Sequence, residues 1–159
     1  MIRAATKSVD DTRALAGEIA ALAKPGDLVV LAGDLGTGKT AFAQGFARGL
    51  GVDEPVTSPA FILVRTYEGR LPMVHMDVYR LDQMQELVDL GIAELLDDGG
   101  VTLVEWGDAV TPALPADFLE VRLESGTAPD DRLLTVRSVG PSWPPRAQAL
   151  RLALAPWTV

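Results

Sequence analysis

Residues 33–40 constrain the fold of this chain more than any other stretch, because they read Gly-Asp-Leu-Gly-Thr-Gly-Lys-Thr. Glycines at 33 and 38 followed by Lys39 and Thr40 match the phosphate-binding P-loop. Glycines permit a tight turn whose backbone N–H groups point at an anion. The lysine supplies a positive charge for the β- and γ-phosphates, and the threonine supplies a hydroxyl for Mg²⁺. The residues expected to bind the nucleotide here are Asp34, Gly36, Thr37, Gly38, Lys39 and Thr40.

The segments on both sides predict the strand–loop–helix context that the motif requires. Residues 28–32 form an apolar run, Leu-Val-Val-Leu-Ala, typical of a buried strand. Within residues 41–50, Phe42, Phe46 and Leu50 fall on one helical face. The loop is therefore expected at a helix N-terminus, where the dipole and the free N–H groups favour phosphate. A chance glycine-rich turn containing Lys-Thr would lack this context.

Composition narrows the other functions open to the chain. Its 159 residues favour a single domain over 1–159, and the net charge of −8 argues against binding nucleic acid through a broad basic surface. There is no cysteine and one histidine, which excludes thiol chemistry and histidine-rich metal sites. No apolar run approaches the ~20 residues of a membrane span, and no signal peptide is evident. We therefore expect a cytoplasmic protein without a membrane contact.

The remaining elements are expected from hydrophobic periodicity and turn residues. Residues 1–8 predict an edge strand, and Ser8 with Asp11 predicts a capped helix that ends before Pro25. Helices are also expected over residues 81–96 and, within the tail 142–159, over 144–155. Further strands are expected at 61–67 and 71–79, as a hairpin, at 101–106, and at 118–124 and 131–138, as a meander at one side of the sheet.

Two acids follow apolar strand segments and are candidates for the metal and the attacking group. Asp77 comes after Pro-Met-Val-His-Met, and Glu105 comes after Val-Thr-Leu-Val. A nucleotide site needs an acid for Mg²⁺ and a group that orients the nucleophile, and either acid could serve. The alternative is that both are ordinary strand-end acids in solvent. His75 shares a strand face with Asp77, and it is either a site residue or a satisfied core histidine.

Three further residues are candidates because of their position. Thr57 and Ser58 precede a proline in the connection after the P-loop helix, where switch regions of P-loop hydrolases lie, although a simple turn would look the same. Trp106 directly follows Glu105, so it either packs in the core or lies beside the site. We expect all three to lie near the nucleotide.

Together these residues resemble the bacterial TsaE (YjeE) family over most of residues 8–107. The P-loop is shared with many NTPases. More specific are Val-Thr-Ser-Pro-Ala-Phe at 56–61, His-Met-Asp-Val-Tyr-Arg-Leu at 75–81, the region 90–92 and Val-Glu-Trp at 104–106. One departure is Ala60, where the family usually has threonine, so a hydroxyl contact from that position is missing.

The resemblance implies an α/β P-loop fold whose parallel central sheet is flanked by antiparallel strands. It implies a weak ATPase, needed for threonylcarbamoyladenosine in tRNA, that acts with the TsaD and TsaB proteins and meets tRNA only indirectly. It also implies that ATP and Mg²⁺ are bound, with Thr40 and an acid, Glu105 or Asp77, holding the metal. The switch-like segment maps onto residues 57–59, and nothing is carried over to the last ~50 residues.

Two rival functions use the same loop. Short P-loop chains are often small-molecule kinases, which should show an arginine-bearing lid, but Arg65, Arg70 and Arg80 are dispersed and no lid insertion is evident. Ras-type guanine readers use Asn-Lys-x-Asp, whereas this chain has no asparagine. Residues 8–12 are a further candidate for contact with adenine.

Overall fold

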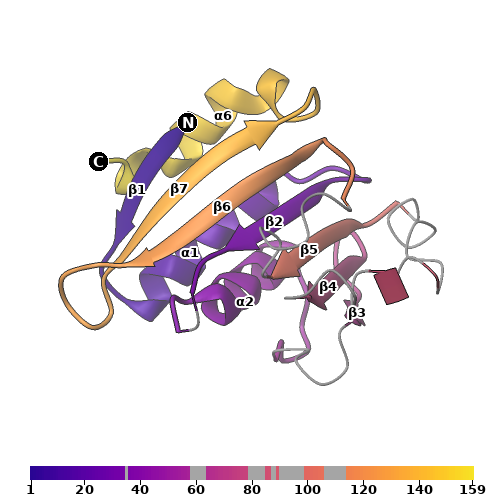
Figure 1. The fold of residues 1–159 in the computed structure, drawn as a ribbon, viewed down its shortest axis with the longest axis horizontal. Helices are drawn as coiled ribbons and strands as arrows, with labels where there is room; N and C mark the ends of the chain where they lie inside the picture. The colour runs from indigo at the N-terminus through magenta and orange to yellow at the C-terminus, as the bar shows by residue number, and fades with distance from the viewer. Residues whose placement is uncertain (35, 58–63, 79–84, 87–88, 90–98, 106–113) are drawn as a thin grey trace.

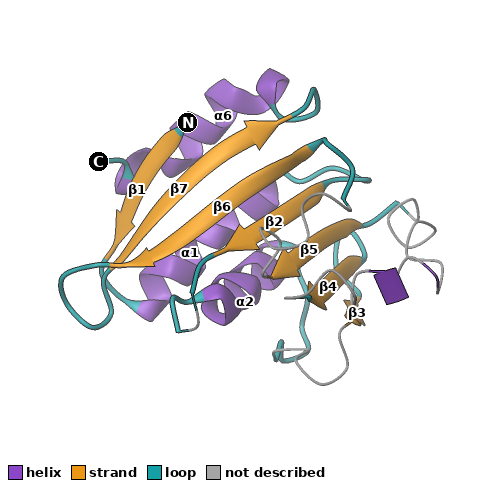
Figure 2. Cartoon of the chain, in the orientation of Figure 1, coloured by secondary structure: helices purple, strands orange, loops and turns teal. Residues whose placement is uncertain are grey.

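The computed structural model describes residues 1–34, 36–57, 64–78, 85–86, 89, 99–105 and 114–159. The remaining residues are grey in Figure 2. The predicted helix over 81–96 lies almost wholly outside the described residues. So do Ser58, Ala60, Trp106 and the first part of the strand predicted at 61–67.

Strands in the described residues form one sheet in the order β1-β7-β6-β2-β5-β4-β3 (Figure 1). Their bounds agree closely with the predicted strands. They are β1 Ile2–Thr6, β2 Leu28–Ala32, β3 Val64–Tyr67, β4 Met73–Asp77, β5 Val101–Glu105, β6 Phe118–Ser125 and β7 Arg132–Val139.

The pairing confirms a parallel centre flanked by antiparallel strands. β2 is parallel to both β5 and β6, and β4 is parallel to β5. β1 and β7 continue the sheet antiparallel beyond β6, and β3 closes the other edge antiparallel to β4. The predicted hairpin of β3 and β4 is confirmed. The predicted meander is correct in that β6 and β7 pair antiparallel. β6 also pairs parallel with β2, so it belongs to the parallel centre and not to one side of the sheet.

Helices α1 (Val9–Ala21), α2 (Lys39–Gly49) and α6 (Ala147–Leu154) pack against one face of the sheet. Figure 2 shows α1 and α2 side by side behind the strands. Short 3₁₀ turns, η2 (Pro144–Arg146) and η3 (Ala155–Trp157), flank α6. The main core lies between this face and the helices, and it includes Leu31, Phe42, Phe46 and Leu103. No helix in the described part of the chain is both long and apolar enough to cross a membrane.

Helices α1 and α2 approach closely because α2 carries glycine where it crosses α1. A Cβ on Gly45 would lie 2.2 Å from the carbonyl oxygen of Arg13, and one on Gly49 would lie 2.7 Å from that of Gly17. Any side chain at either position would force the helices apart. Since α2 begins in the P-loop, this contact fixes the direction in which the loop faces.

The C-terminal segment is tied to the start of the P-loop strand. Arg146 donates from both terminal nitrogens to the carboxylate of Asp27, at 2.6 and 2.9 Å, and both residues are buried. The same guanidinium lies over the ring of Trp143, 3.8 Å from its centre. The two termini meet at the β1 edge, where the backbone N–H of Val159 donates to the carbonyl of Arg3 (Figure 1).

Candidate functional site

The predicted P-loop connects β2 to α2 at the carboxyl end of the parallel strands. Three of its glycines have positive φ: Gly33 at 141°, Gly36 at 81° and Gly38 at 100°. These angles are strained for residues with a side chain. At Gly33 space also matters, because a Cβ there would lie 2.5 Å from the carbonyl oxygen of Leu123 in β6. The glycine spacing in the sequence is therefore required by the backbone path.

The N-terminus of α2 has no side-chain cap. Its N-cap, Gly38, offers no side-chain hydrogen bond, and the first turn contains no acid. By contrast, α1 is capped by the hydroxyl of Ser8, which accepts from the N–H of Asp11, and has two acids in its first turn. An uncapped helix start presents free N–H groups and a positive dipole end to an anion. The predicted phosphate cradle therefore has the backbone it needs.

Two side chains of the loop are engaged with its own carbonyls. The Lys39 ammonium donates to the carbonyls of Gly33 at 2.7 Å and Asp34 at 2.8 Å, and the residue is buried. The Thr37 hydroxyl donates to the carbonyl of Asp34 at 2.7 Å, so it shapes the turn. Thr40 is half-buried in the first turn of α2, whereas Asp34 and Gly36 are exposed.

The two predicted acids lie side by side at the ends of neighbouring strands. Asp77 of β4 is the register partner of Glu105 of β5, and Glu105 in turn pairs with Leu31 of the P-loop strand. Both acids are buried, at 5% and 3% exposure. The alternative that they are strand-end acids in solvent is therefore wrong. The strand order also places Glu105, and not Asp77, next to the strand that leads into the loop.

His75 joins this group. Its Nε2 lies 2.5 Å from Oε2 of Glu105, and the histidine is fully buried. The prediction that it shares a face with Asp77 is confirmed by the β4 register. The structure therefore brings His75, Asp77 and Glu105 together near the carboxyl ends of β4 and β5, on the sheet face that α2 covers.

The chemistry of these donors suits a hard cation bound together with phosphate. The candidates are a threonine hydroxyl and two carboxylates, and oxygen ligands are what Mg²⁺ prefers. Within the described ranges, no cluster of three His, Cys, Asp or Glu side chains could hold a metal by itself. Mg²⁺ bound at protein sites usually keeps waters and takes substrate phosphate oxygens as ligands, so the short protein donor set fits the ion.

The other predicted residues are only partly accounted for. Thr57 is exposed, and residues 58–63, which follow it, lie outside the described residues. Ser58 and Trp106 lie outside the described residues, so their predicted roles remain predictions. Residues 8–12, the candidates for adenine contact, form the cap and the first turn of α1.

The structure adds Arg132, which sequence reasoning missed. Its guanidinium donates to the carbonyls of Thr37 at 2.9 Å and Gly36 at 3.3 Å, from the start of β7. It therefore clamps the P-loop from the outer strands. An arginine at a strand start, 95 residues from its partner, carries no local sequence signal.

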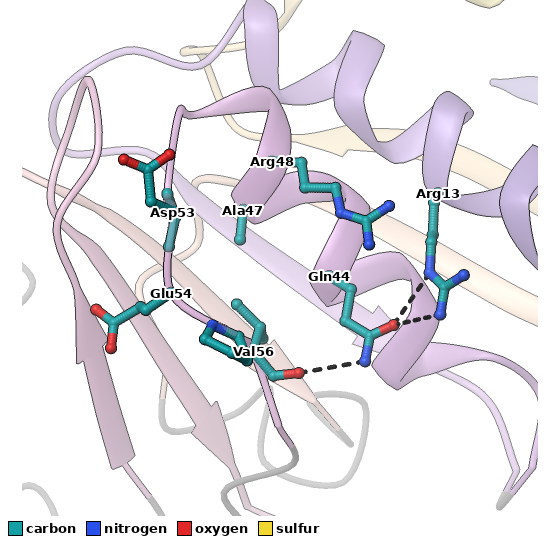
Figure 3. A pocket seen from close by; sticks show the side chains of 9 residues that line it. Arg13, Gln44, Ala47, Arg48, Asp53, Glu54 and Val56 are labelled. Atoms are coloured by element: carbon teal, nitrogen blue, oxygen red, sulfur yellow. Dashed lines mark hydrogen bonds between the residues drawn. The ribbon is translucent and has the colours of Figure 1, made fainter.

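Gln44 is a second such residue, and it ties the loop helix to the connection that follows it. Its Nε2 donates to the carbonyl of Val56 at 3.2 Å, and its Oε1 accepts from Nε and Nη2 of Arg13 at 3.1 and 2.8 Å (Figure 3). We call residues 52–57 the strap. A cavity of about 330 Å³ lies between the strap and the two helices. Gln44 thus holds the residue that precedes Thr57.

Comparison with known proteins identifies the family. The family model described as threonylcarbamoyl adenosine biosynthesis protein TsaE matches residues 6–133. The chain belongs to the TsaE family. The TsaE match includes the P-loop, the His75–Asp77 strand and Glu105, and it ends just beyond the clamp residue Arg132.

Individual relatives agree with this assignment. The TsaE protein of Bacillus subtilis is 43% identical over 136 residues, covering 85% of this chain and 84% of that protein. The TsaE protein of Treponema pallidum is 40% identical over 122 residues, covering 77% and 90%. Both are named as tRNA threonylcarbamoyladenosine biosynthesis proteins. The crystal structure of Bacillus subtilis YdiB superimposes with a TM-score of 0.78 at 37% identity, covering 98% of this chain and 97% of that one.

Proposed function

We propose that this TsaE-family chain is a Mg²⁺-dependent ATPase that serves the formation of threonylcarbamoyladenosine in tRNA. The observation that carries the proposal is the uncapped start of α2, beside the register pair of Asp77 and Glu105. A phosphate cradle and buried carboxylates at one sheet edge are the parts that nucleotide hydrolysis needs. The names of the relatives supply the pathway.

In this proposal each residue of the site has a distinct role. The N–H groups of the loop bind the phosphates, and Lys39 turns its ammonium from the loop carbonyls to the β- and γ-phosphates. Thr40 and Glu105 would hold Mg²⁺, which would neutralise phosphate charge when bound with the nucleotide. Asp77 is the second acid and orients the attacking water. Arg132 keeps the loop in the shape that aims its N–H groups at the anion.

We further propose that hydrolysis drives the cycle of a transferase complex built from TsaD- and TsaB-type proteins. On this proposal the isolated chain is a slow ATPase, and its partners complete the site. Thr57 and Ser58 would sense the γ-phosphate, as switch segments do. Gln44 holds Val56, the strap residue that precedes Thr57, so a partner that contacts the strap could affect the site.

The test is a phosphate-release assay over a nucleotide panel, with and without TsaD and TsaB, and with candidate small-molecule acceptors. We expect slow Mg²⁺-dependent hydrolysis of ATP that rises at least tenfold with both partners. Asp77→Asn and Glu105→Gln should lower the stimulated rate by about 100-fold while nucleotide affinity changes little. Phosphate transfer to an acceptor would favour the rival kinase function, and stimulated rates equal to the parent in both variants would remove the two-acid site.

A further inference from the structure

The contact between His75 and Glu105 differs from the other polar contacts near the loop because it is wholly buried. His75 has no exposed surface and Glu105 is 3% exposed. They are not register partners: Leu103 lies opposite His75, and Asp77 lies opposite Glu105. The Glu105 side chain therefore meets the ring diagonally, across the two strands, at 2.5 Å.

We assign the hydrogen of this contact from the chemistry of the two groups. An ionised carboxylate only accepts, so Nε2 must carry the hydrogen for this contact to be a hydrogen bond. Nδ1 is buried and has no hydrogen-bond partner within the described residues. We therefore assign the ring hydrogen to Nε2 and not to Nδ1, since leaving a buried N–H without an acceptor would cost more. The ring thus donates from one defined nitrogen to one defined oxygen.

Packing alone does not call for histidine at this position. Apart from the two acids at the strand ends, the inward-facing neighbours on β2, β4 and β5 include the apolar residues Leu31, Met73 and Leu103. A buried polar pair is rarely better for stability than apolar side chains of similar volume. Polar residues kept at such positions commonly serve the site that they support.

From this geometry we propose that His75 is a positioning residue for the metal-binding carboxylate of Glu105, which deepens the proposed function and rests on it. Its Nε2–H holds Oε2, so the carboxylate keeps one rotamer and Oε1 is the oxygen left for the cation. Hydrogen bonds of this kind, one shell out from a metal, typically contribute 10- to 100-fold in metal affinity. His75 itself contacts neither metal nor nucleotide in this account.

The first test uses the parent protein and needs no variant. His75 is the single histidine of the chain, so ¹⁵N-histidine labelling gives signals from one ring only. We expect Nε2 to be protonated and Nδ1 to be unprotonated, and the Nε2 signal to shift when Mg²⁺ is added to the ADP complex. A ring protonated on Nδ1 alone, or an Nε2 signal that does not respond to Mg²⁺, would overturn the proposal.

The second test separates positioning from packing. His75→Leu removes the donor at similar volume, and His75→Gln places an amide nitrogen at the same number of bonds from the backbone. We expect His75→Leu to raise the Mg²⁺ concentration for half-maximal effect on ADP binding about tenfold, with metal-free ADP affinity unchanged. His75→Gln should recover most of the loss. Mg²⁺ dependence equal to the parent in His75→Leu would refute the proposal, as would equal loss in both variants.

A control variant separates the loss of Mg²⁺ binding from a general loss of stability. Arg146→Met breaks a buried ion pair of the described residues that lies away from the loop, between Arg146 and Asp27 at the C-terminal segment. It should lower the unfolding temperature and leave Mg²⁺ dependence as in the parent. Failure of the parent to bind any nucleotide would defeat the proposed function, whereas parent-like Mg²⁺ binding in His75→Leu would defeat only the positioning role.

Discussion

Two glycines of the P-loop form a matched pair for substitution, because a side chain would meet different surroundings at each. Gly33 and Gly36 both have positive φ. A Cβ on Gly33 would lie 2.5 Å from the Leu123 carbonyl oxygen, whereas one on Gly36 meets nothing within 4 Å. Gly33→Ala should therefore disturb the junction of β2 and β6, while Gly36→Ala should strain the loop alone.

The expected magnitudes follow from these contacts. A residue with a side chain in a left-handed conformation costs about 1–2 kcal/mol. If the loop of Gly36→Ala relaxes without ligand, binding must restore that strain, so ADP affinity should fall about 5- to 30-fold with little change in unfolding temperature. Gly33→Ala adds an overlap with backbone that cannot rotate away. This variant should lose about 2 kcal/mol or more of folding free energy, which lowers the unfolding temperature by roughly 4–8 °C.

Calorimetric ADP titration and thermal unfolding measure both effects. The control is Gly26→Ala, in the turn before β2, where φ is 88° and nothing lies within 4 Å of an added Cβ. It carries similar backbone strain away from the loop, so its ADP affinity should equal that of the parent. The reasoning would be refuted if Gly33→Ala melted like Gly36→Ala, or if Gly26→Ala lost ADP affinity as Gly36→Ala does.

Three further predictions follow from contacts of the described residues. Arg132→Met should release the loop and weaken ADP binding about 5- to 30-fold. Arg151→Met, which replaces an exposed arginine of α6, should leave ADP binding unchanged. Equal ADP affinities of Arg132→Met and the parent by titration would contradict the clamp. Gln44→Leu should speed hydrogen exchange of the strap amides, and exchange rates equal to the parent would show that the strap is held by other contacts. The hydrogen bond from Arg137 holds the pKa of Glu120 below its ordinary value of 4.5. A lowered folded pKa adds stability above pH 4.5 that is lost as the pH falls through the lowered pKa. Arg137→Met should therefore cost under about 1 kcal/mol at pH 7, since this arginine is half exposed. The cost should fade in acid unfolding, and one that persisted unchanged to low pH would contradict this cause.

The P-loop and its flanking strand and helix are predictable because local conformation and burial determine which residue types occur there. Glycine is needed where φ is positive, and the apolar spacing of α2 is needed to bury one helix face. The cap at Ser8 was also predicted and is confirmed, although the Asp11 carboxylate accepts from the N–H of Lys7 and so does not complete the reciprocal pair. Such features depend on residues a few positions apart.

Contacts between distant segments were predicted less well. The parallel pairing of β6 with β2 joins strands that are separated by most of the chain, and a strand pattern does not name its neighbour. The clamp from Arg132 has the same origin. By contrast, the pairing of Asp77 with Glu105 was within reach, because both acids end apolar strands and parallel strands end at one edge of a sheet.

The central claim is that the loop between β2 and α2 binds ATP through Lys39 and the uncapped helix start. Titration of ATP with Mg²⁺ into the parent and into Lys39→Ala tests it most directly, with circular dichroism to confirm that both are folded. The account predicts one saturable site in the parent and an affinity at least 100-fold weaker, or no measurable binding, in a folded Lys39→Ala. Equal ATP affinity in the two folded proteins would contradict it.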